Sequence, residues 1–179
     1  MKRVLYVLSL LADSDINWLI ASGRRESVPA NCPIIEENQA CEHLFILLTG
    51  RFAVTVETDG AGVQQLTELA AGDIVGEISL LDSRPPSATV RAVVASEVMR
   101  IPRADLLAKL DMSPEFGRRF YRALAVMLAQ RLRAASNRTR PDQQEDGTLS
   151  SEDEIDPELL EAIELGAKRF QWITERLGT

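Results

Sequence analysis

Apolar residues near the N-terminus recur at the three-to-four spacing of one helix face. They are Val4, Val7, Leu8 and Leu11, followed after a polar break by Ile16, Leu19 and Ile20. Lys2 and Arg3 before this run imitate the start of a secretory signal, but no small-x-small cleavage site closes it. We therefore expect a helix that packs on the protein. Since no apolar stretch approaches the roughly 20 residues that cross a bilayer, we expect a cytoplasmic protein without membrane contact.

The pattern changes at about residue 24 to short apolar runs separated by turn residues, which is typical of a small barrel or sandwich. Strands are expected at 25–28, 34–35, 43–48, 51–57, 64–69, 88–94 and 97–101. Thr49 and Gly50 lie between the third and fourth runs and predict a tight hairpin. Alternating apolar residues of the fourth run should then point inward.

Helical spacing returns after residue 102. Residues 103–110 are expected to form one helix, and Ser113 can cap a second, with Pro114 at its first position. This second helix should be long, because its apolar stripe runs to about Ser136. The members of the stripe are Phe116, Phe120, Leu124, Met127, Leu128, Leu132 and Ala135.

The C-terminal part of the chain begins with a polar, acidic segment that is typical of a flexible linker. Asp156 and Pro157 can then cap and start a helix with one apolar face, although Gly166 in its middle costs about 1 kcal/mol relative to alanine. We therefore expect a domain at 1–136, a linker at 137–156 and an amphipathic helix at 157–179.

The net charge of −7 is unevenly distributed. Residues 112–140 hold seven arginines against Glu115 alone, whereas residues 141–179 hold 11 acidic and three basic side chains. A DNA-recognition helix needs positive charges beside it to meet the phosphates. The acidic C-terminal segment, with its single expected helix, does not meet this requirement, and we expect no DNA binding.

One segment carries a recognisable chemical motif: residues 72–81 read GDIVGEISLL and residues 82–92 read DSRPPSATVRA. It resembles the phosphate-binding cassette of the cyclic-nucleotide-binding domain family, which includes the catabolite activator protein and the protein kinase A regulatory subunit. The resemblance covers about residues 8–137. It is most specific at GE (76–77) and SATV (87–90). The implied fold is mainly β with flanking helices: a double-stranded β-helix, or jelly-roll barrel, plus C-terminal helices, in a stand-alone module.

In that family a glutamate at the start of a short helix holds the ribose hydroxyl, and backbone N–H groups meet the cyclic phosphate. Carried over, the resemblance implies a ligand site at Gly76, Glu77, Ile78, Ser79, Arg84, Ser87 and Ala88. The physics is consistent, because the N-terminal end of a helix favours anions. Glu77 could equally be a carboxylate that only caps its helix.

The family's phosphate-pairing arginine falls on Pro86 in this chain. A guanidinium–phosphate contact contributes about 1.5 to 3 kcal/mol, or about one to two decades of affinity. We therefore expect weak affinity for cyclic AMP or another cyclic nucleotide. Arg84 could replace the missing group, or it is an exposed loop charge, since Pro85 and Pro86 stiffen the path.

The family's base-contacting residues lie on the long helix, where Arg131 and Ser136 are the polar candidates by position. Both could instead be surface residues beside a stripe that packs in the core or in a dimer. Because this helix commonly pairs with its twofold mate in the family, the resemblance implies a homodimer.

Motifs of catalysis and metal binding are absent from the sequence. It has no nucleophile elbow or Walker loop, and His43 with Cys32 and Cys41 falls short of a four-ligand zinc pattern. We expect neither an enzyme nor a metal or other cofactor. Two functions stay open: a regulatory small-molecule sensor with a degenerate cassette, or a ligand-free scaffold that docks a protein partner through its C-terminal helix.

Overall fold

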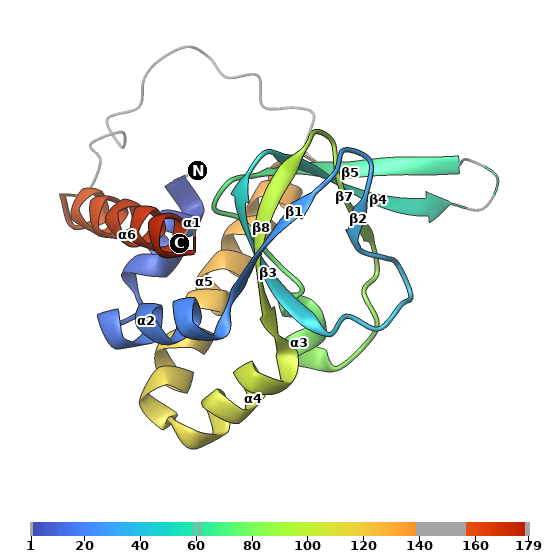
Figure 1. Cartoon of the computed structure of the whole chain (residues 1–179). Coiled ribbons are helices and arrows are strands. Elements are labelled where there is room, and N and C mark those ends of the chain that lie inside the picture. The colour runs from blue at the N-terminus through green and yellow to red at the C-terminus, as the bar shows by residue number, and fades with distance from the viewer. Residues whose placement is uncertain (1, 59, 61, 139–156, 178–179) are drawn as a thin grey trace, which may run out of the picture.

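The computed structural model describes the chain except residues 1, 59, 61, 139–156 and 178–179 (Figure 1). Most of the expected linker thus lies outside the described residues. Two helices precede the strands, and a short one interrupts them. The helices are α1 (Lys2–Ser9), α2 (Asp13–Ser22), α3 (Glu77–Asp82), α4 (Arg103–Met112), α5 (Pro114–Arg138) and α6 (Pro157–Arg176).

The strands form two four-stranded antiparallel sheets, in the orders β1-β8-β3-β6 and β2-β7-β4-β5. Each expected strand is present, and the sequence pattern did not predict the two-residue β6. The strands are β1 (Arg24–Val28), β2 (Pro33–Ile35), β3 (His43–Thr49), β4 (Arg51–Thr58), β5 (Gly62–Ala70), β6 (Ile74–Val75), β7 (Thr89–Ala92) and β8 (Ser96–Pro102).

The hairpin expected at Thr49 and Gly50 is wrong, because β3 and β4 belong to different sheets. Gly50 has a φ of +87° and lies so close to Ser96 that a Cβ at this position would clash with it. Here the chain turns a corner from one sheet to the other. The reason is that β3 already pairs on both edges, with β8 and β6, so β4 pairs with β5 and β7 instead.

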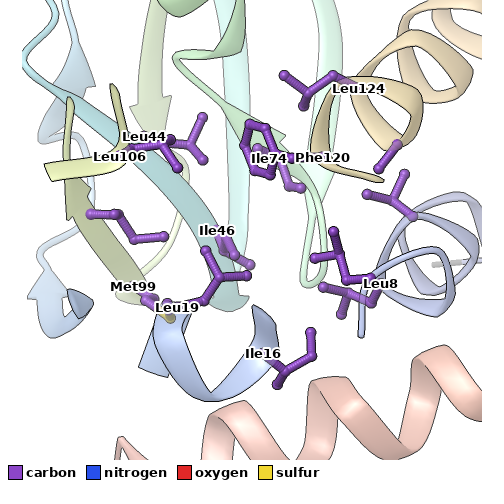
Figure 2. Close-up of a cluster of buried hydrophobic side chains, with 14 of the residues drawn as sticks. Leu8, Ile16, Leu19, Leu44, Ile46, Ile74, Met99, Leu106, Phe120 and Leu124 are labelled. Atoms are coloured by element: carbon purple, nitrogen blue, oxygen red, sulfur yellow. The ribbon is translucent and has the colours of Figure 1, made fainter. Parts of the chain in front are cut away.

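Residues 44–48 of β3 are all buried because this strand has a core on each face. The strand lies between the two cores, because successive side chains of a strand point to opposite faces of the sheet. Leu44 and Ile46 pack against the helices (Figure 2), and Leu48 belongs to the same cluster. Phe45 and Leu47 pack against the second sheet.

The apolar N-terminal segment packs in the helical core as expected, but it forms two helices rather than one. Val7, Leu8 and Leu11 are buried. The backbone N–H of Ala12 donates to Oδ2 of Asp15 at 2.8 Å and so begins α2 after the break. Among the described residues, no helix has the length and apolar content to cross a membrane.

Helix α6 packs along α1 (Figure 1). A Cβ at Gly166 would clash with the backbone of Leu5, so the glycine that weakens this helix permits its close contact with α1. Arg169 donates to the carbonyl oxygens of Leu8 at 3.0 Å and Ser9 at 3.1 Å, at the C-terminal end of α1. Ile173 is fully buried in the helical core. The C-terminal helix is therefore part of the helical layer.

The expected apolar stripe of α5 is divided between core and surface. Phe116, Phe120, Leu124 and Met127 are buried, but the side chain of Leu132 is 69% exposed. The first half of the stripe thus belongs to the core, whereas Leu132 in the second half lies at the surface.

Candidate ligand-binding site

Gly76 joins β6 to α3 with a φ of +88°, in the left-handed region. A Cβ at this position would lie 2.5 Å from the carbonyl oxygen of His43, so a glycine is required here both for its φ and for its size. This turn starts α3 at Glu77 and directs that side chain into the protein, where it is only 2% exposed.

A cavity of about 170 Å³ lies beside the start of α3. Both sheets contribute apolar side chains to its wall, and α3 and α5 contribute polar ones. The structure brings together here most of the predicted ligand site, namely Gly76, Glu77, Ile78, Ser79, Ser87, Ala88 and Arg131. Thr67 of β5 also lines the cavity, and no local signal in the sequence distinguished it from a surface position.

Glu77 and Arg131 form an ion pair within this wall. Nη1 of Arg131 donates to Oε1 of Glu77, and Nη2 donates to the carbonyl oxygen of Ile74 at 2.6 Å. Burial raises the pKa of Glu77 above its ordinary value, although the Arg131 guanidinium acts in the opposite direction. The two residues were predicted separately, for the ribose and for the base. Their pairing connects the cassette directly to α5.

Arg84 and Ser136 do not line the cavity. Arg84 is exposed, its backbone N–H donates to Oδ1 of Asp82 at 3.0 Å, and it lines a different hollow. Ser136 is exposed near the end of α5. Pro86 is buried in the cavity wall, where its carbonyl oxygen accepts the N–H of Asn38 at 2.8 Å.

The wall is rich in hydroxyl groups and poor in positive charge. Ser79, Ser87 and Thr67 supply hydroxyls. Among the described residues that line the cavity, Arg131 is the only cation, and it is bound to Glu77. The volume is below the roughly 300 to 1,000 Å³ of typical ligand pockets, so a nucleotide would have to widen the cavity as it enters.

Residues 25–113 match the family model of the cyclic nucleotide-binding domain. The domain that these residues form belongs to this family. The solved structures below share its fold, which confirms the expected jelly-roll class of mainly β structure with flanking helices.

Three comparisons describe the likeness. An uncharacterized NTE family protein of Mycobacterium tuberculosis is 29% identical over 157 residues, which are 88% of this chain and 26% of that protein. The catabolite activator protein of Thermus thermophilus has a TM-score of 0.61 at 28% identity, over 72% of this chain and 59% of its own. A cyclic nucleotide-binding domain from Methylobacillus flagellatus has a TM-score of 0.70 at 23% identity, over 79% of this chain and 83% of its own.

The chain spans about a quarter of the mycobacterial relative, and 56% of the cyclic AMP receptor protein of Thermus thermophilus, with which it is 29% identical over 125 residues. The likeness to the Methylobacillus domain shows the fold alone. The family nevertheless places the chain among regulatory ligand-binding domains.

Proposed function

We propose that this domain is a regulatory sensor whose cassette cavity binds a small phosphate-bearing ligand, with a cyclic nucleotide as the first candidate. The observation that carries the proposal is the ion pair between Glu77 and Arg131. A buried carboxylate at the start of α3 is a suitable acceptor for a sugar hydroxyl, and here it also holds the long helix α5.

Ligand binding and helix position are coupled through this pair. A sugar hydroxyl that donates to Glu77 competes with Arg131 for the same carboxylate. Arg131 must then share or leave Glu77, and its contact with the Ile74 carbonyl changes with it. If the ligand binds more tightly when Arg131 has left Glu77, it shifts the equilibrium toward that conformation and moves α5 with it. A difference in affinity between the two conformations is sufficient for such a population shift.

The phosphate has weaker support in this chain. Ser87 and the N–H groups at the start of α3 are its candidate donors, while Pro86 stands where the family has an arginine. We infer an affinity about one to two decades below that of a cassette that keeps the arginine. Arg84, which is exposed and lines another hollow, enters this site only if its loop rearranges.

A homodimer through α5 is part of the proposal. Tyr121, Ala125, Leu128 and Leu132 follow one another at spacings of four, three and four, which is the seam of a coiled coil. Tyr121 is 45% and Leu132 69% exposed in the single chain. Ser136 lies one turn beyond this seam, where it would approach a partner rather than its own cavity.

The alternative scaffold function, in which the C-terminal helix docks a protein partner, has less support. Helix α6 is already engaged with α1 through Gly166 and Arg169, and its Ile173 is buried in the helical core. The absence of enzymatic activity, of cofactors and of DNA binding, and the cytoplasmic location, stay predictions.

Calorimetric titration with cyclic AMP, cyclic GMP and cyclic dinucleotides at near-physiological salt tests the sensor. We expect saturable binding to at least one of them in the protein, and its loss in Glu77→Gln. Glu115→Gln, which changes an exposed carboxylate on α5, is the matched control. The absence of binding of all these ligands up to about 1 mM would reject a cyclic nucleotide as the ligand.

A further inference from the structure

A second hollow, of about 570 Å³, lies where the start of β3, the end of α3 and the start of α4 meet. It is separate from the cassette cavity, with which it shares only Ser79 in its wall. Its volume falls within the roughly 300 to 1,000 Å³ of typical ligand pockets. The groups relevant to binding are Ser83, Arg84, Pro102, Arg103 and Leu107.

Arg103 is the central polar group of this wall. Its Nη2 donates to Oγ of Ser83 at 3.1 Å and to the carbonyl oxygen of Ser79 at 3.4 Å. Its Nε is buried and has no hydrogen-bond partner among the described residues. A buried donor without an acceptor is destabilising, so a ligand oxygen that reached Nε as it bound would remove this cost.

The surroundings of Arg103 add positive potential. Arg84 also lines the hollow, and α4 begins at Arg103, so the positive end of this helix dipole lies in the wall. Glu42 also lines the hollow, and its carboxylate opposes this charge. Its backbone carbonyl oxygen accepts the backbone N–H of Arg103 at 2.8 Å. Two guanidinium groups against one carboxylate leave the wall net positive.

We propose that this hollow is a second binding site, for a small phosphate ester with an apolar substituent. Guanidinium forks match the oxygens of a phosphate, and Pro102 and Leu107 offer apolar surface to the rest of the molecule. The site is linked to the cassette, because the Ser79 carbonyl that accepts from Arg103 belongs to the residue that both walls share. The proposal does not require that the cassette bind a cyclic nucleotide.

Phenyl phosphate and inorganic phosphate are suitable probes, followed by nuclear magnetic resonance of the ¹⁵N-labelled full chain. We expect saturating shifts at the amides of Ser83, Arg84 and Ala104, with tighter binding of phenyl phosphate than of inorganic phosphate. Arg103→Gln should weaken binding of phenyl phosphate at least about tenfold. Arg118→Gln, on an exposed part of α5, should not change it.

Arg84→Gln is the second variant, because Arg84 is exposed and its loss should leave the fold intact. We expect it to weaken binding several-fold. The proposal is overturned by the absence of saturation up to about 10 mM, by shifts confined to Gly76 and Glu77, or by equal affinities of both variants and the control.

Discussion

Nε and Nη2 of Arg119 on α5 donate to the two carboxylate oxygens of Asp15 on α2, at 2.6 and 3.0 Å. Asp15 is buried and also accepts the N–H of Ala12. This pair fixes α5 to the N-terminal helices. Further along the same helix, Arg131 fixes it to the cassette. The two ion pairs therefore anchor α5 at both the helical layer and the ligand site.

We predict that Asp15→Asn lowers the free energy of unfolding by about 2 kcal/mol at neutral pH, because Arg119 loses a charged partner in the core. Urea denaturation measures this change. Arg118→Gln, which breaks an exposed pair with Glu115, should change stability by less than about 0.5 kcal/mol. Equal effects of the two substitutions would contradict a special role for the Arg119 pair.

The same pair predicts a dependence on pH. Burial acts to raise the pKa of Asp15, but the hydrogen bonds from Arg119 and Ala12 and the nearby positive charges prevail and lower it from its ordinary 3.8. A carboxyl group whose pKa is lower in the folded state contributes its full stabilisation at pH values above its ordinary pKa. This contribution is lost as the pH falls through the pKa of the folded state. Denaturation between about pH 5 and pH 2 should show a smaller loss of stability in Asp15→Asn than in the unmodified protein.

Pro86→Arg should raise the affinity for cyclic AMP by about one to two decades, because it restores a guanidinium beside the cassette. Pro85→Arg is the control, since Pro85 is exposed and outside the cassette wall. Calorimetry measures both affinities. An equal gain in the two variants would show general attraction of an anion rather than a specific contact.

Arg131→Gln should destabilise the fold by about 3 kcal/mol, because Glu77 is then buried without its cation. The double variant Glu77→Gln with Arg131→Gln should be more stable than Arg131→Gln alone. A double-mutant cycle of urea denaturation measures the coupling energy. Additive effects of the two substitutions would mean that the residues do not act as a pair.

Gly166→Ala should lower stability by about 2 kcal/mol or detach α6, since the new methyl group clashes with the backbone of Leu5. Gly117→Ala in α5 is the matched control, because its Cβ would lie at an ordinary 3.5 Å from the Leu110 carbonyl oxygen. There the higher helix propensity of alanine should stabilise the protein by up to about 1 kcal/mol. Thermal unfolding distinguishes them, and stabilisation by both would refute the close packing of α6.

Leu132→Glu should convert a dimer to a monomer, because it places a charge in the exposed seam of α5. Sedimentation analysis of the full chain measures the change. Met112→Glu, at an even more exposed apolar position at the end of α4, should leave the assembly unchanged. A monomeric unmodified protein would remove the basis of the α5 dimer.

Local spacing was sufficient to predict every strand except β6, the long helix and the helix after Pro157. These features depend on which side of an element is apolar, and that information lies within a few neighbouring residues. The motif at 76–77 and 87–90 likewise predicted the part of the cavity wall that surrounds the start of α3, because both stretches lie in one short segment of the chain.

Tertiary structure decided the relations between distant residues. Local turn signals at Gly50 could not show that β3 already has two partners, so the hairpin expectation was wrong. From the sequence, Gly166 only lowers the expected stability of its own helix. The close approach of the Leu5 backbone, which leaves no room for a Cβ, explains why a glycine occupies this position. Glu77 and Arg131 are 54 positions apart and were assigned to different parts of a ligand. Their pairing depends on the path of the whole chain, because an ion pair requires proximity in space and leaves no periodic pattern in sequence.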